Sequence, residues 1–146
     1  MGEPTFNVVI DDLMDKLRAR TEIISNGFQV EDAWPGEEHQ RTGAIWVEDI
    51  VNNDKVAGMN AGRINTNEVY TLILICDVLV EGGTAKDARE RVMIMANAVL
   101  DELAVSKRLA GNVAMVRSGG WRLRQTIAPT GRGCSVRIEA IVSGRR

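Results

Sequence analysis

The stretch that decides the fold is residues 68–80, which read EVYTLILICDVLV. Side chains alternate between the two faces of a strand. Here Leu72 and Leu74 fall in one apolar set, and Ile73 and Ile75 fall in the other. A strand that is apolar on both faces normally lies inside a sheet and is covered twice. The sequence therefore predicts a central strand over residues 68–80, around which the other elements are arranged.

A long helix is predicted directly after the central strand. Residues 85–109 carry apolar side chains at steps of three and four, which is the spacing of one helical face. Thr84 and Asp87 have the spacing of a capping box at its start. Ile94 and Val105 fall on the opposite, polar side. They are either incidental surface residues or contacts for a partner.

The residues before the central strand predict one helix and two strands. The helix covers residues 6–24, where apolar residues recur at helical spacing, and the strands cover residues 28–32 and 44–51. Residues 52–67 are rich in Asn and Gly and predict an extended loop or a loose hairpin tip. The only histidine, His39, lies in a polar loop without a nucleophile or metal ligand at a useful spacing, which is typical of a solvated side chain.

The last third of the chain predicts three strands, over residues 113–117, 121–128 and 134–142, of which the last two form a hairpin. Alternation makes one face of this hairpin apolar and the other rich in arginine. The candidate residues for facing a ring lumen or DNA are Arg117, Arg122, Arg124, Arg132 and Arg137. Such arginines bind phosphates, pair with acids of another subunit, or are simply solvated. No aromatic residue alternates with them to stack on bases.

These elements together predict a single α+β domain over residues 1–146. It has a mostly antiparallel or mixed sheet of four to six strands, two helices packed on one face and a C-terminal β-hairpin. Two helices cover only one face, so the second face of the central strand needs another cover. Either another copy of the chain packs there, or the N-terminal helix and the loops do. Ile73 and Leu74 are the candidate interface residues on this strand.

Composition and charge narrow the function classes. The net charge is −2, but residues 1–106 hold 9 Lys and Arg against 19 Asp and Glu, whereas residues 107–146 hold 9 Lys and Arg and one acid. This asymmetry is either a chance feature or a polarised surface suited to head-to-tail association. Two cysteines provide no disulfide framework, no apolar run is long enough for a membrane span, and no signal peptide is evident. No catalytic, metal-binding or cofactor motif occurs, so we expect a protein without enzymatic activity or a cofactor.

The order of elements resembles the tail terminator, or tail completion, proteins of long-tailed bacteriophages. The matching pieces are the helix Phe6–Ile24, the strand Ala44–Val51, the Asn/Gly-rich excursion and the strand Glu68–Val80. The final piece is the helix with ARERV at residues 88–92 and VLDEL at residues 99–103. The resemblance extends to about Met115, and the C-terminal hairpin is longer and more basic than the family pattern.

The resemblance implies a ring of this chain, typically of six copies, in the virion at the head-proximal end of the tail. Such a ring caps the tail tube, ends its growth and contacts the head–tail connector or head-completion protein. It implies partners among virion proteins, DNA only in transit, no membrane and assembly in the host cytoplasm. It transfers no catalytic residues. The alternatives are a head-completion or neck protein, and a small nucleic-acid-binding protein or enzyme that uses the basic hairpin.

Overall fold

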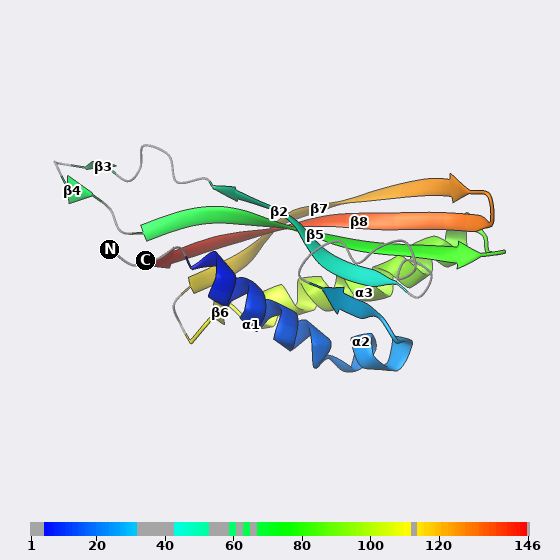
Figure 1. Cartoon of the computed structure of the whole chain (residues 1–146), viewed down its shortest axis with the longest axis horizontal. Helices are drawn as coiled ribbons and strands as arrows, with labels where there is room; N and C mark the ends of the chain where they lie inside the picture. Colours follow the sequence, from blue (N-terminus) through cyan, green and yellow to red (C-terminus); the bar gives the residue numbers. More distant parts are fainter. Residues whose placement is uncertain are drawn as a thin grey trace.

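The computed structural model places a layer of helices against one face of a six-stranded sheet (Figure 1). The structure describes residues 5–31, 43–52, 59–60, 63–64, 67–111 and 114–145. The elements are α1 (Phe6–Arg18), α2 (Thr21–Asn26), β1 (Gln29–Glu31), β2 (Ala44–Asn52), β3 (Met59–Asn60), β4 (Arg63–Ile64), β5 (Asn67–Glu81), α3 (Ala85–Val105), β6 (Arg108–Leu109), β7 (Ala114–Ala128) and β8 (Gly131–Arg145).

The strands of the sheet lie in the order β1-β2-β5-β8-β7-β6. Every neighbouring pair is antiparallel except β1 and β2, which are parallel. β3 and β4 pair separately as a short antiparallel ladder, as predicted for a hairpin tip in this part of the chain. The predicted α+β class, the central position of β5 and the C-terminal hairpin of β7 and β8 are therefore confirmed. The loop around His39 lies outside the described residues.

The core lies between the helices and the even-numbered side chains of β5. Leu72 and Leu74 have no solvent exposure, and neither do Leu13 and Leu17 of α1 or Val99 of α3. Full burial of such a side chain contributes about 1.5–3 kcal/mol to folding. These alternating and helical patterns therefore determine which face of the sheet the helices cover.

The predicted first helix is divided into two. α1 ends at Arg18, and Arg20 has an extended backbone with φ −73° and ψ 138° before α2 begins. α2 ends at Asn26 and is capped by Gly27, whose left-handed φ of 68° suits a residue without a Cβ. Ile24, which the prediction placed on the buried stripe, is 65% exposed. The single helix over residues 6–24 was therefore wrong.

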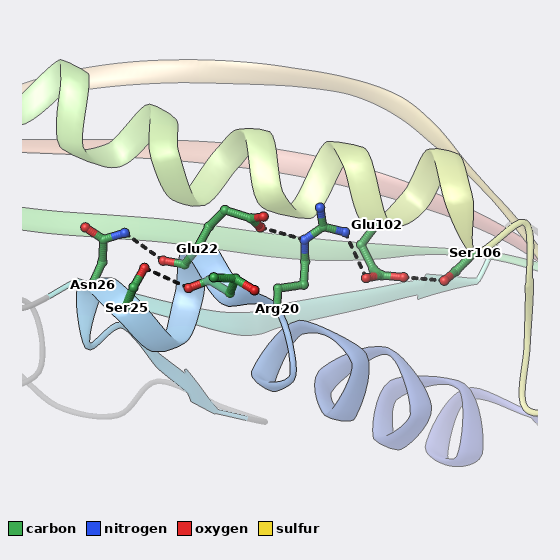
Figure 2. A network of polar contacts seen from close by, with 7 residues as sticks. Arg20, Glu22, Ser25, Asn26, Glu102 and Ser106 are labelled. Atoms are coloured by element: carbon green, nitrogen blue, oxygen red, sulfur yellow. Dashed lines mark hydrogen bonds and ion pairs between the residues drawn. The ribbon is translucent and has the colours of Figure 1, made fainter.

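Contacts to α3 explain where the first helix breaks (Figure 2). The Arg20 guanidinium donates to the Glu22 carboxylate at 2.8 Å and to the Glu102 carboxylate at 3.0 Å. The hydroxyl of Ser106 also donates to Glu102, which is only 8% exposed. The hydrogen bond to Glu22, followed by that to Glu102, raises the pKa of Arg20 against the effect of burial. This network fixes the α1–α2 junction against the C-terminal end of α3.

The start of the long helix is as predicted and its end is not. The backbone N–H of Asp87 donates to the Thr84 hydroxyl, and the backbone N–H of Thr84 donates to the Asp87 carboxylate. Together these two hydrogen bonds complete a capping box. These hydrogen bonds to the carboxylate lower the pKa of Asp87. α3 ends at Val105 rather than at residue 109, because residues 108 and 109 form β6 and pair with β7.

One continuous strand, β7, replaces the two strands predicted over residues 113–117 and 121–128. Its register with β8 shifts between Ser118 and Gly120, which is typical of a β-bulge. Gly120 has φ 124°, and a Cβ on Gly119 would lie 2.8 Å from the Ile141 Cδ1 atom. The glycines therefore accommodate a bulge inside the strand instead of ending it.

The second face of β5 is more buried within one copy than predicted. Ile73 is 2% exposed although it points away from the helix-covered core. It lies between Asp49 of β2 and Glu139 of β8, and Ile75 likewise lies between Trp46 and Arg137. These neighbours flank Ile73 and Ile75 on the helix-free face, whereas the N-terminal helix packs on the opposite face (Figure 1).

Candidate functional site

The helix-free face of the sheet carries a row of side chains that crosses four strands. The register aligns Trp46 of β2, Ile75 of β5, Arg137 of β8 and Arg122 of β7. The row therefore changes across the sheet from aromatic and apolar to basic.

The adjacent row continues this chemistry. It aligns Ala44, Asp77, Ser135 and Arg124 on the same four strands. All residues of these two rows except Ala44 line a hollow of about 530 Å³, with Trp46 on one side and arginines on the other.

Arg122 and Arg137 are directly opposite each other in the β7–β8 ladder. Like charges in this position destabilise a sheet. Arg137 donates to the Glu139 carboxylate at 3.2 Å, with both side chains 40% exposed or more. Within the described residues, Arg122 and Arg124 form no ion pair. A partner with negative charge would therefore relieve this repulsion.

Asp77 is the titratable group in the hollow whose ionisation the fold alters. Burial raises its pKa from 3.8 to about 6, although a hydrogen bond from the Val78 backbone N–H acts in the opposite direction. Asp77 lies beside Ser135 on β8. Its charge therefore changes in mildly acidic solution, unlike that of an ordinary surface aspartate.

Four of the five candidate arginines lie on the helix-free face of the sheet. Arg117 aligns with Ile141 and shares the helix-free face with Arg122, Arg124 and Arg137. Arg132 belongs to the other face, because it aligns with Val80 and is an odd number of positions from Arg137. The roles proposed for these residues in a lumen or against DNA stay predictions.

The predicted interface residues lie in different environments. Leu74 has no exposure and Ile73 is 2% exposed, so a partner reaches neither without rearrangement. Ile94 and Val105 are 39% and 78% exposed on α3, eleven positions apart and hence on nearly the same helical face. A contact role for the exposed pair stays a prediction.

An exposed apolar edge on the hairpin was missed by sequence reasoning. Trp121 and Ile127 are 54% and 80% exposed on β7. Both share the face of Leu123, which packs against the core, but their own side chains remain mostly exposed. Trp121 therefore does not fill the core, whereas Trp46, at 7% exposure, is buried.

Other site chemistry is sparse in the described part of the chain. No group of three or more His, Cys, Asp and Glu side chains there could hold a metal ion. Cys76 and Cys134 are both free and buried, and burial raises the pKa of each thiol. None of the described helices has the length and apolar character needed to cross a membrane.

The comparisons with known proteins show a likeness of fold. No protein-family model matches the chain, and no curated protein matches it. Among solved structures, it is similar to a chain in the structure titled "Virion of native gene transfer agent (GTA) particle", with a TM-score of 0.62. The two chains share a fold. The match covers 98% of this chain and 100% of that chain at 16% sequence identity.

Proposed function

We propose that this chain is a structural subunit of a phage-like particle, and that it forms a ring that caps the tail tube. The observation that carries the proposal is the full-length similarity in fold to a chain of a gene transfer agent virion, which covers 98% of this chain and 100% of that chain. The resemblance to tail terminator proteins narrows the role within the particle to the head-proximal end of the tail. There the ring ends tube growth and contacts the head–tail connector.

The surface of the chain supports assembly into a ring. A cyclic ring with more than two subunits uses two different patches, one on each neighbour. The chain offers basic residues on β7 and β8, acidic residues on β2, and exposed apolar residues on α3 and the hairpin. Unlike patches on opposite sides of one subunit favour head-to-tail association, which a ring requires, over a two-fold dimer.

Binding to purified particle parts tests the proposed role. The chain is mixed with tail tubes and, separately, with portal-bearing heads, and bound protein is measured by sedimentation and electron microscopy. We expect rings at one end of the tubes and no binding to heads that lack a tail. Binding to heads alone would contradict the tail role and support a head-completion or neck protein.

Nucleic-acid binding is the second candidate function, and the four arginines on the helix-free face favour it. Phosphate binding by these arginines should weaken steeply with added salt. Replacing Arg122 and Arg124 with Ala should abolish it, whereas Lys86→Ala with Arg89→Ala on α3 serves as a charge-matched control. Binding that is insensitive to salt, or equally weakened by the control, would exclude this function. In a ring, such arginines would contact DNA only in transit.

A further inference from the structure

Within the part of the chain that the structure describes, each outer edge of the sheet is paired along only part of its length. β1 pairs with β2 only over Ala44–Trp46, so among the described residues no strand pairs with this edge from Val47 onward. At the other edge, β6 pairs only with the first two residues of β7. Beyond the Val116 N–H, which donates to the Lys107 carbonyl, no described strand covers β7. Open edges of this kind are templates for pairing with another chain.

The two open edges carry opposite charge. Glu48 and Asp49 are exposed at the β2 edge, whereas Arg122 and Arg124 are exposed on β7. The acidic pair lines a groove of about 520 Å³ between α1 and β2, to which Asp11 adds a third carboxylate. The arginines lack ion-pair partners within the described residues. Each edge therefore has the charge that the other edge needs.

Exposed apolar residues of the two edges lie on the same face of the sheet, so they would also meet across the interface. Asp49 aligns with Ile73 and so shares the helix-free face with the arginines, whereas Ile50 aligns with Leu72 on the helix-covered face. On β7, Trp121 and Ile127 occupy that same helix-covered face. If one sheet continued into another, acids would meet arginines on one face and Ile50 would meet exposed apolar residues on the other.

Strand direction is consistent with this pairing. β2 and β8 run one way, and β5 and β7 run the other, because each neighbouring pair among them is antiparallel. If the strands in the ring run roughly parallel to its symmetry axis, the rotation that relates neighbouring copies preserves the strand directions. The β2 strand of one copy would then lie antiparallel to the β7 strand of the next, which is a common and stable ladder.

We infer that the β7 edge of one copy pairs with the β2 edge of a second copy of this chain. The inference rests on the proposed ring and names its interface. Residues 121–127 of β7 supply Arg122, Arg124 and two apolar side chains. Residues 47–51 of β2 supply Glu48, Asp49 and Ile50. The interface joins unlike patches, so its repeated use builds a ring when the rotation between neighbours closes, with the arginines next to each subunit boundary.

Charge reversal tests the pairing on the full chain. One variant carries Glu48→Lys and Asp49→Lys, and the other carries Arg122→Glu and Arg124→Glu. Self-association is measured by sedimentation equilibrium at low salt up to millimolar protein. Each variant alone should associate roughly a hundredfold more weakly than wild type, because like charges then meet. Glu90→Lys with Asp101→Lys, and Lys86→Glu with Arg89→Glu, are the matched controls on α3, and circular dichroism confirms folding.

Mixing the two reversed variants is the decisive step. Each restores complementarity for the other, so an equimolar mixture should regain the association of wild type while each variant alone stays dissociated. The inference would be overturned if the mixture remained monomeric, or if the charge-reversed variants lost no more association than the control variants. It would also be overturned if the variant without Arg122 and Arg124 associated more strongly than wild type, or if the wild-type chain were monomeric at millimolar concentration. Capping of tail tubes is measured separately, so the proposed function stands or fails on its own.

Discussion

Replacing Arg20 with Ala should destabilise the fold more than any other single change to a charged side chain of the helical layer. The variant loses two charge-assisted hydrogen bonds, at 2.8 Å to Glu22 and 3.0 Å to Glu102. The Glu22 side chain is 45% exposed, so this half of the network contributes little. The Arg20 and Glu102 side chains are only 21% and 11% exposed, so their pairing is much less screened by solvent.

The expected loss is about 2–3 kcal/mol, the range for hydrogen bonds to charged groups when a buried partner is left. For a chain of this size, that corresponds to a fall in Tm of roughly 4–12 °C. Urea unfolding followed by circular dichroism measures the loss, and a double-mutant cycle with Glu102→Gln isolates the pair. The exposed pair of Lys86 and Glu90, 3.7 Å apart, is the control, and Lys86→Ala should change stability by less than about 0.5 kcal/mol. An Arg20→Ala loss no larger than that of the control would refute the reasoning.

Three further predictions follow from burial and ionisation. Leu74→Ala should lower the free energy of unfolding, measured in urea, by about 2–5 kcal/mol, because the side chain has no solvent exposure. A loss under about 1 kcal/mol would show that Leu74 lies outside the core. Trp121→Ser with Ile127→Ser should change stability by less than about 0.5 kcal/mol, yet lower retention on a hydrophobic-interaction column; a large loss of stability would show that these side chains pack. The pKa of Asp77 is raised to about 6 from 3.8, so the folded state holds the proton more tightly and this group's contribution to stability falls as pH rises through that window. Asp77→Asn should flatten the decline in unfolding free energy between pH 3.8 and about pH 6. An unchanged dependence of that free energy on pH would contradict the raised pKa.

The sequence predicted most of the sheet because long strands with a buried face alternate strictly. β5 and β8 each present a regular apolar set, and this periodicity depends only on local spacing. The same counting predicted which face of the hairpin holds Arg122, Arg124 and Arg137. Counting back from Arg137 would also have placed Arg132 on the opposite face, because the two are an odd number of positions apart.

The errors in the helices come from contacts between residues distant in sequence. The apolar stripe of the first helix continues to Ile24, so its spacing gives no sign of a break. The break forms where Arg20 reaches Glu102, 82 positions away, which local propensity cannot indicate. In the same way, α3 stops where residues 108 and 109 pair with β7. Tertiary contacts of this kind override helical periodicity.

The sequence predicted only part of the candidate site. The arginines could be assigned to one face, but the hollow needs Trp46 and Asp77 beside them, and that depends on how β2 aligns with β5. The placement of Ile73 between Asp49 and Glu139 likewise depends on the ladder. Strand order and register are determined by contacts between residues that are distant in the sequence. For that reason, the exposure of Trp121 at the end of a correctly predicted apolar face was also missed.

The length distribution of tail tubes assembled with and without this chain tests the proposed role most directly. Tube protein is polymerised in vitro, the chain is added at increasing ratios, and tubes are imaged by electron microscopy. A capping ring should shorten the tubes in proportion to the amount added and leave a ring at one end of each tube. Unchanged lengths, with both ends bare at saturating amounts of folded protein, would contradict a tail-terminating ring.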